Sequence, residues 1–161
     1  MKRLILMRHA EAQSPLEAAN DFSRILTEKG VSEASKAAKF FFDQELLIDK
    51  LIYSNAARTT STAQLVGEVN NIDDTDMLAN ELLYNAPVGT VLDFILRLEN
   101  DWNTVFLVGH NPTFSYLAEY LSDHAPISLS PSHAVAIQFD VENWTMLTQG
   151  LGRMEWIYSG M

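Results

Sequence analysis

Two histidines stand directly behind two short apolar runs, a placement that suits chemistry on a shared ligand. Leu4–Met7 ends at Arg8 and His9, and much later in the chain Val105–Val108 ends before His110. An imidazole can act as a nucleophile, a general acid or base, or a metal ligand. Which of these roles applies depends on the side chains that accompany the two histidines.

Arginines accompany the histidines at the same kind of position. Arg8 precedes His9, and Arg58 follows the apolar run Leu51–Tyr53. A guanidinium binds phosphate or carboxylate oxygens bidentately, and two arginines with two histidines suit a phosphoryl group best because its equatorial oxygens need several donors. Like-charge repulsion from the arginines would keep His9 neutral and able to attack phosphorus. Its other ring nitrogen then needs an acceptor, often a backbone carbonyl, to fix the tautomer.

A zinc site is the main alternative built on the same histidines. His9, His110 and a carboxylate such as Glu11 or Glu81 are suitable ligand types. Two arginines beside those ligands oppose a divalent cation, and the HExxH spacing of many zinc enzymes is absent. Taken singly, each histidine or arginine could also be structural. Only their convergence favours a phosphate site.

The elements that would position these residues alternate between strand-like and helix-like segments. The predicted strands are 4–7, 51–53, 105–108, 133–140, 145–148 and 154–158, with a hairpin at 142–143 joining the fourth and fifth. The predicted helices follow Thr27, cover 56–69 and 90–98, and begin at Pro112, while 77–83 is ambiguous. Ser54 and Asn55 are suitable N-cap types for the second helix. This order predicts an α/β fold whose sheet is mostly parallel with an antiparallel edge.

That fold class predicts where the polar residues meet. In open α/β sheets, ligands bind beyond the carboxyl ends of the strands. Arg8 and His9 follow the first strand, 54–58 follow the second, and His110 follows the strand 105–108. If these three strands are parallel neighbours, two arginines and two histidines converge at one edge of the sheet.

Composition narrows the classes of protein and partner. The chain has 161 residues, a formal net charge of −10 and no cysteine, which excludes thiolate zinc sites, disulfides and cysteine nucleophiles. An acidic surface argues against nucleic acid. No stretch approaches the ~18 apolar residues of a membrane helix, and the N-terminal apolar run is too short for a signal peptide. We expect one domain over 1–161, soluble, cytoplasmic and monomeric, without a nucleic-acid or membrane partner.

Four ordered sequence blocks resemble one known family. The segment LILMRHAEA resembles the Arg-His-Gly signature of the histidine phosphatase superfamily, which has the phosphoglycerate-mutase-like fold. The later blocks resemble D-x-x-R-x-L-T-x-x-G at 21–30, S-x-x-x-R-T-x-x-T-A at 54–63, and the second-histidine block at 108–112. The short chain, the Arg-His-Ala variant and the stretch 82–86 are most similar to the SixA-type phosphohistidine phosphatase branch.

The resemblance implies a fold, a mechanism and a substrate class. It implies a three-layer α/β/α sandwich and a hydrolase without metal or organic cofactor. His9 would be the phosphorylated nucleophile, with Arg8, Arg58 and His110 completing the phosphate pocket. The implied substrate is phosphohistidine on a protein, in a signalling role, or a small phosphate ester. The alternatives are a small-molecule phosphatase, a phosphoglycerate-mutase-type phosphotransferase, for which the chain lacks room for a lid, and a non-catalytic phosphate-binding regulatory module.

Two positions depart from the wider family pattern. Ala10 stands where glycine is commoner, and its methyl group fits if the backbone there has negative φ. Larger members carry a proton donor on an inserted segment, which SixA-like chains often lack. Glu81 is the candidate for that acid here, and the alternative is that it is a solvent-facing carboxylate.

Overall fold

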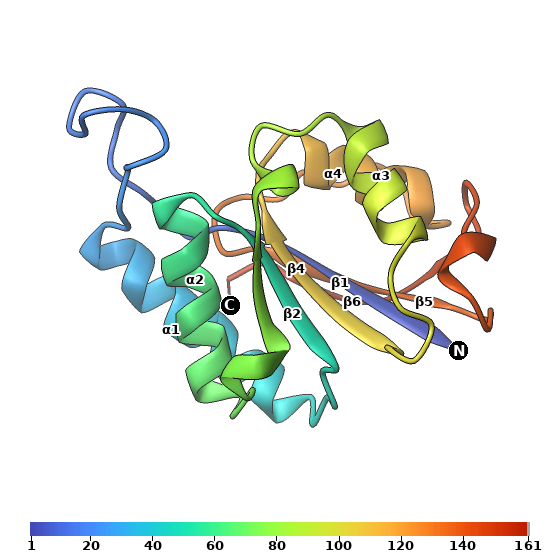
Figure 1. Ribbon diagram of the computed structural model, residues 1–161. Helices are drawn as coiled ribbons and strands as arrows, with labels where there is room; N and C mark the ends of the chain where they lie inside the picture. Colours follow the sequence, from blue (N-terminus) through green and yellow to red (C-terminus); the bar gives the residue numbers. More distant parts are fainter. Residues whose placement is uncertain (161) are drawn as a thin grey trace.

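A six-stranded mixed sheet organises the molecule, and its strands lie in the order β3-β2-β4-β1-β5-β6. The computed structural model describes residues 1–160 (Figure 1). The strands are β1 (Lys2–Arg8), β2 (Lys50–Ser54), β3 (Met77–Asn80), β4 (Thr104–Gly109), β5 (Ala134–Phe139) and β6 (Arg153–Tyr158). β1 to β4 pair in parallel, whereas β5 runs antiparallel to both β1 and β6. The expected parallel sheet with an antiparallel edge is confirmed.

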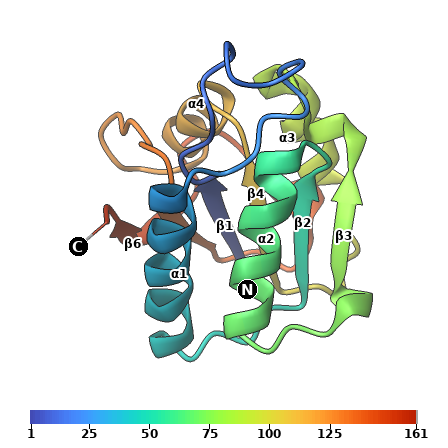
Figure 2. The ribbon, with the colours of Figure 1, turned by 90° about the vertical axis from the view of Figure 1, so that its left-hand side faces the viewer.

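Helices cover both faces of the sheet and make the three expected layers. α1 (Glu28–Asp43) and α2 (Ala57–Val69) lie on one face, and α3 (Val88–Leu96) and α4 (Thr113–Leu121) on the other (Figures 1 and 2). Leu4 and Leu6 of β1 pack toward α3 and α4, and Ile5 and Met7 toward α1 and α2. A strand covered on both faces needs an unbroken apolar run, which explains Leu4–Met7. Within residues 1–160, every helix falls short of the length and apolarity needed to cross a membrane.

The loop from β1 to α1 passes over the carboxyl ends of the parallel strands (Figure 2). Both ends of this loop are joined at its base. The N-cap residue Thr27 donates its backbone N–H to the Glu11 carbonyl at 3.0 Å, and its hydroxyl lies 2.9 Å from Glu11 Oε1. The same hydroxyl accepts from the Gly30 N–H, as helix capping requires. These hydrogen bonds hold the two ends of the loop together.

Gly30 permits this closure, and a methyl group there would prevent it. A Cβ on Gly30 would lie 2.0 Å from the Glu11 carbonyl oxygen, whereas a Cβ on Gly89, in α3, meets nothing within 4 Å. We expect Gly30→Ala to lower the free energy of unfolding by about 1–3 kcal/mol through overpacking. The matched variant Gly89→Ala should raise it by about 0.5–1 kcal/mol through helix propensity. Urea unfolding measures both, and equal effects would contradict the proposed clash.

The predicted strand at 145–148 and its hairpin are wrong. Trp144–Met146 forms a short 3-10 helix, η3, and the antiparallel partner of β5 is β6. The Trp144 side chain is fully buried, and its indole N–H donates to the Trp102 carbonyl at 2.9 Å. Burying this large aromatic ring against a distant segment turns the chain inward and prevents strand pairing. The ambiguous stretch 77–83 forms β3 and a second 3-10 helix, η2 (Glu81–Leu83).

Candidate active site

The carboxyl ends of three neighbouring strands bring the four predicted side chains together. β2, β4 and β1 are adjacent in the sheet, so the chain segments that follow them emerge side by side. His9, Arg58 and His110 are only 7%, 5% and 8% exposed, and the two imidazole centroids are 5.4 Å apart. With Arg8, they line one cavity of about 360 Å³. The predicted convergence is therefore present in the fold.

His9 is held in one tautomer by the backbone. Its Nδ1 lies 2.7 Å from the Ala10 carbonyl oxygen, which can only accept, so Nδ1 carries the proton. Nε2 is then unprotonated and accepts from Arg58 Nε at 3.3 Å. Burial lowers the pKa of His9 to about 3, and Arg58 and Arg8 act in the same direction. The neutral ring thus directs the lone pair of Nε2 at the Arg58 guanidinium.

His110 is held in the opposite tautomer, with its proton on Nε2. Its Nδ1 lies 3.3 Å from Arg58 Nη2, a donor, and its Nε2 lies 2.8 Å from Ser54 Oγ. Nδ1 therefore accepts and Nε2 donates to the serine hydroxyl. Ser54 was expected to cap α2, but the N-cap is Ala56, without a side-chain hydrogen bond. Burial, reinforced by Arg58, lowers the pKa of His110 to about 4.

These two histidines make stability depend on pH. A histidine whose folded-state pKa is depressed binds a proton in the unfolded chain first, so stability falls as pH drops below about 6.5. From pH 7 to pH 5, we expect the free energy of unfolding of His110→Gln to decline less steeply than that of the wild type, by up to about 1.4 kcal/mol per pH unit. Urea unfolding at pH 5, 6 and 7 measures this slope. The exposed His124→Gln is the control, and parallel slopes for the wild type and His110→Gln would contradict the prediction.

A main-chain carbonyl holds two further parts of the site. The Leu129 carbonyl accepts from Arg8 Nη1 at 3.1 Å and from Asn111 Nδ2 at 2.6 Å. It thereby joins the segment behind β1 to the segment behind β4. Arg8 Nε is buried and has no hydrogen-bond partner among the residues that the structure describes. A buried donor of this kind needs a partner, and a phosphoryl oxygen would supply one.

The structure adds four residues to the predicted site. The cavity is also lined by Asp21, Arg24, Asn85 and Asn111. Asp21 lies on the loop between β1 and α1, and accepts from Tyr84 Oη at 2.6 Å, Arg58 Nη2 at 3.1 Å and Arg24 Nη1 at 3.1 Å. The Tyr84 hydroxyl, with Arg24 and Arg58, lowers the pKa of Asp21 to about 2. Asp21 and Arg24 belong to the D-x-x-R block, which was the available signal in the sequence.

Glu81 lies outside this arrangement. It opens η2, its side chain is exposed, and the residues that line the cavity include Asp21 but not Glu81. The assignment of Glu81 as proton donor stays a prediction. Residues 1–160 contain no group of three or more His, Cys, Asp or Glu side chains placed to hold a metal ion. Glu11, the other carboxylate of the zinc alternative, lies 2.9 Å from the Thr27 hydroxyl.

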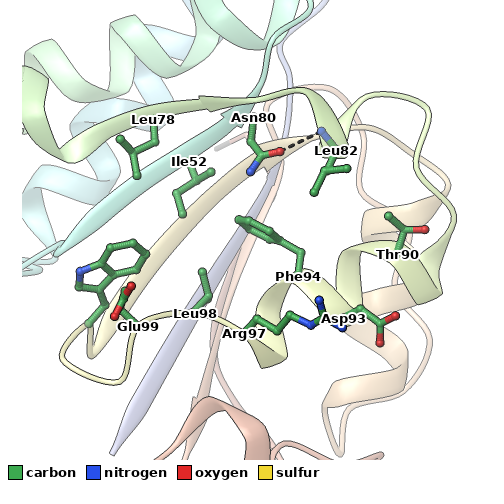
Figure 3. Close-up of a pocket in the computed structure, with 11 residues that line it drawn as sticks. Ile52, Leu78, Asn80, Leu82, Thr90, Asp93, Phe94, Arg97, Leu98 and Glu99 are labelled. Carbon is green, nitrogen blue, oxygen red and sulfur yellow. Dashed lines mark hydrogen bonds between the residues drawn. The ribbon is translucent and has the colours of Figure 1, made fainter.

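A second, more apolar cavity is separate from this chemistry. It has a volume of about 400 Å³ and lies between β3 and α3 (Figure 3). Leu78 and Phe94 face into it, with Asp93, Arg97 and Glu99 around it. None of its lining residues is shared with the cavity around His9, and none is a histidine. The larger volume therefore does not mark the reactive site.

A cavity lined by arginines, with a buried neutral histidine at the carboxyl ends of the parallel strands, suits phosphoryl transfer, and the comparisons agree. Residues 4–83 match the model of the histidine phosphatase superfamily (branch 1). The phosphohistidine phosphatase SixA of Escherichia coli is 28% identical over 151 residues, 89% of this chain and 92% of that protein. A Mycobacterium tuberculosis protein is 30% identical over 141 residues, 88% of this chain and 85% of that one. A structure of SixA complexed with tungstate has a TM-score of 0.82 at 26% identity, covering 98% of this chain and 97% of that one.

The chain belongs to the histidine phosphatase superfamily. The similarity to SixA covers nearly its whole length, which confirms the expected SixA-type branch and the phosphoglycerate-mutase-like fold. The expected class of hydrolase, a phosphatase, is confirmed with it.

Proposed function

We propose that this phosphatase removes the phosphoryl group from phosphohistidine on another protein, with His9 as the covalent nucleophile. One observation carries the mechanism. His9 is fixed on the Ala10 carbonyl through Nδ1, so Nε2 is unprotonated, and its lone pair accepts from Arg58 Nε at 3.3 Å. Nucleophile and phosphate-binding cation are thus in contact before substrate enters. That hydrogen bond must give way as Nε2 bonds to phosphorus.

The proposed reaction has two steps. In the first, His9 Nε2 bonds to phosphorus as the bond between phosphorus and the leaving group breaks, and the electron pair of that bond departs with the leaving group. In the second, a water oxygen bonds to phosphorus as the bond between phosphorus and Nε2 breaks. The electron pair of that bond returns to Nε2, the water protons leave with the phosphate or to solvent, and His9 is neutral again. Arg8 and Arg58 stabilise the charge on the equatorial oxygens in both steps. His110 joins them when its Nε2–H, which donates to Ser54 in this structure, turns to a phosphoryl oxygen. The buried, unpartnered Arg8 Nε is one donor free for this purpose.

The charge of the cavity supports an anionic substrate despite the acidic chain. The formal net charge of the whole protein is −10, yet the cavity holds three guanidinium groups, Arg8, Arg24 and Arg58, and one carboxylate, Asp21. The E. coli relative is named a phosphohistidine phosphatase, and a SixA structure contains tungstate, a tetrahedral oxyanion like phosphate. These features together support phosphohistidine as the substrate.

The experiment compares three reactions of the wild-type protein. Polyhistidine phosphorylated with phosphoramidate tests phosphohistidine hydrolysis, p-nitrophenyl phosphate tests ester hydrolysis, and interconversion of 2- and 3-phosphoglycerate tests mutase activity. We expect release of phosphate from phosphorylated polyhistidine with the highest kcat/KM and no mutase activity. Hydrolysis of the aryl ester alone would contradict the proposed substrate, and absence of all three activities would favour a phosphate-binding module.

A further inference from the structure

The cavity around His9 has a buried floor and an accessible mouth. His9, Arg58 and His110 form the floor and are at most 8% exposed. Asp21 and Asn85 are exposed, and Arg24 is partly buried, so these residues form the mouth. A phosphoryl group bound at the floor must direct its leaving group toward the mouth. The mouth residues therefore meet the part of the substrate that differs between one phosphate compound and another.

Asp21 is the carboxylate among the residues that line the cavity, and its position is fixed. Oδ2 accepts from the Tyr84 hydroxyl at 2.6 Å and from Arg58 Nη2 at 3.1 Å, while Oδ1 accepts from Arg24 at 3.1 Å. The Asp21 backbone carbonyl also accepts from Arg58 Nη1 at 2.8 Å. The Asp21 side chain is nevertheless 45% exposed. It is a rigidly placed anion with room for a further donor.

We propose that Asp21 is the residue that selects phosphohistidine over phosphate esters, by accepting a hydrogen bond from the second ring nitrogen of the substrate imidazole. This inference rests on the proposed function and extends it to the leaving group. A carboxylate oxygen can accept more than one hydrogen bond, so Asp21 need not release Tyr84 or Arg58 to do so. A charge-assisted bond to an imidazole N–H is also stronger than a neutral one.

The chemistry of the leaving group explains why such an acceptor matters. When the P–N bond of the substrate breaks, the bonding electron pair remains on the departing ring nitrogen. If the second ring nitrogen already carries a proton, the group leaves as neutral imidazole, and if it does not, the group leaves as a strongly basic imidazolide. Asp21 favours the protonated form because an anion next to a cation stabilises it. The proton stays on the leaving ring throughout, so Asp21 acts as an acceptor and never as an acid.

An aryl phosphate ester offers no comparable donor. Its leaving group is an oxygen that becomes negative as the P–O bond breaks, and a fixed carboxylate repels that charge. The same side chain that assists phosphohistidine is therefore neutral or unfavourable toward an ester. The ratio of the two activities isolates this effect, because any displacement of Arg58 would affect both substrates alike.

The test uses the isosteric variant Asp21→Asn with 3-phosphohistidine and p-nitrophenyl phosphate. We expect kcat/KM for 3-phosphohistidine to fall about tenfold or more, the scale of one hydrogen bond to a charged group. The loss on p-nitrophenyl phosphate should be smaller, because it contains only the effect of any displacement of Arg58, so the ratio of the two kcat/KM values should fall. Asp21→Glu, which keeps the carboxylate, should recover part of the ratio. Asp123→Asn, an exposed aspartate outside the cavity, is the matched control.

Two results would overturn the inference while leaving the proposed function intact. An equal loss on both substrates would show that Asp21 acts only by positioning Arg58, and unchanged activity on both would show that it does not contact the leaving group. If the wild type hydrolyses p-nitrophenyl phosphate but neither phosphorylated polyhistidine nor 3-phosphohistidine, the proposed function itself fails, and the inference fails with it.

Discussion

Replacing His9 with alanine should remove phosphatase activity by at least about 10³-fold, because the variant has no group to attack phosphorus. Covalent incorporation of ³²P from labelled substrate should disappear with it. Arg58 cannot substitute, because a guanidinium is always cationic and is not a nucleophile. Acid-quench trapping and steady-state assays on both phosphohistidine and p-nitrophenyl phosphate measure the two losses.

His124→Ala is the matched control for this experiment. His124 is exposed, and its ring contacts only the neighbouring Ala125 carbonyl among the hydrogen bonds of the described residues. We expect unchanged activity and unchanged ³²P labelling in this variant. Because His9 is buried, a urea unfolding curve must show that His9→Ala remains folded. A folded His9→Ala protein that kept wild-type turnover would refute covalent catalysis by this residue.

Arg58→Lys should lower kcat/KM by about 10²–10³-fold, although the charge is conserved. Arg58 contacts His9 through Nε, His110 through Nη2, and Asp21 through both Nη atoms. A lysine ammonium is a single point charge and cannot reach these groups in the same plane. The larger part of the loss should appear in kcat, because the guanidinium stabilises charge that develops during transfer.

The control for Arg58→Lys is Arg97→Lys. Arg97 is exposed at the end of α3 and lines the apolar cavity, not the cavity around His9. Its replacement should leave kcat and KM unchanged. Near wild-type activity in a folded Arg58→Lys protein would mean that charge alone suffices at this position, and that the planar set of contacts is not needed for catalysis.

The predicted site residues could be found from the sequence because the parallel sheet obeys a general rule. Each of Arg8, His9, Arg58 and His110 follows an apolar run, and the carboxyl ends of parallel strands meet at one edge. The rule brings these residues together only if their strands are neighbours, and the strand order could not be predicted from the sequence. β4 lies between β2 and β1 although it follows both in the chain. Pairings between segments so distant leave no local pattern, so adjacency remained an assumption until the fold was known.

The rest of the site was missed for an equally physical reason. Asp21 lies in a loop without hydrophobic periodicity, and its role depends on contacts with Arg58 and Tyr84, which are distant in the chain. The D-x-x-R block was visible, but nothing local indicates that the loop folds back over the strand ends. The wrong strand at 145–148 has a similar origin. Its β-forming residues are overruled by burial of Trp144, and strand propensity is strongly dependent on such context.

The contacts of the Leu129 carbonyl should respond differently to substitutions than to insertions or deletions. Because the acceptor that holds Arg8 and Asn111 belongs to the main chain, replacing the Leu129 side chain does not delete it. Deleting or inserting a residue in the segment between α4 and Leu129 moves the carbonyl and disturbs both partners together. The Leu129 side chain is itself buried in the core, so the position should accept only apolar residues of similar size. The constraint on the two hydrogen bonds is separate from this packing and is one of spacing, which a comparison of amino-acid identities alone would overlook.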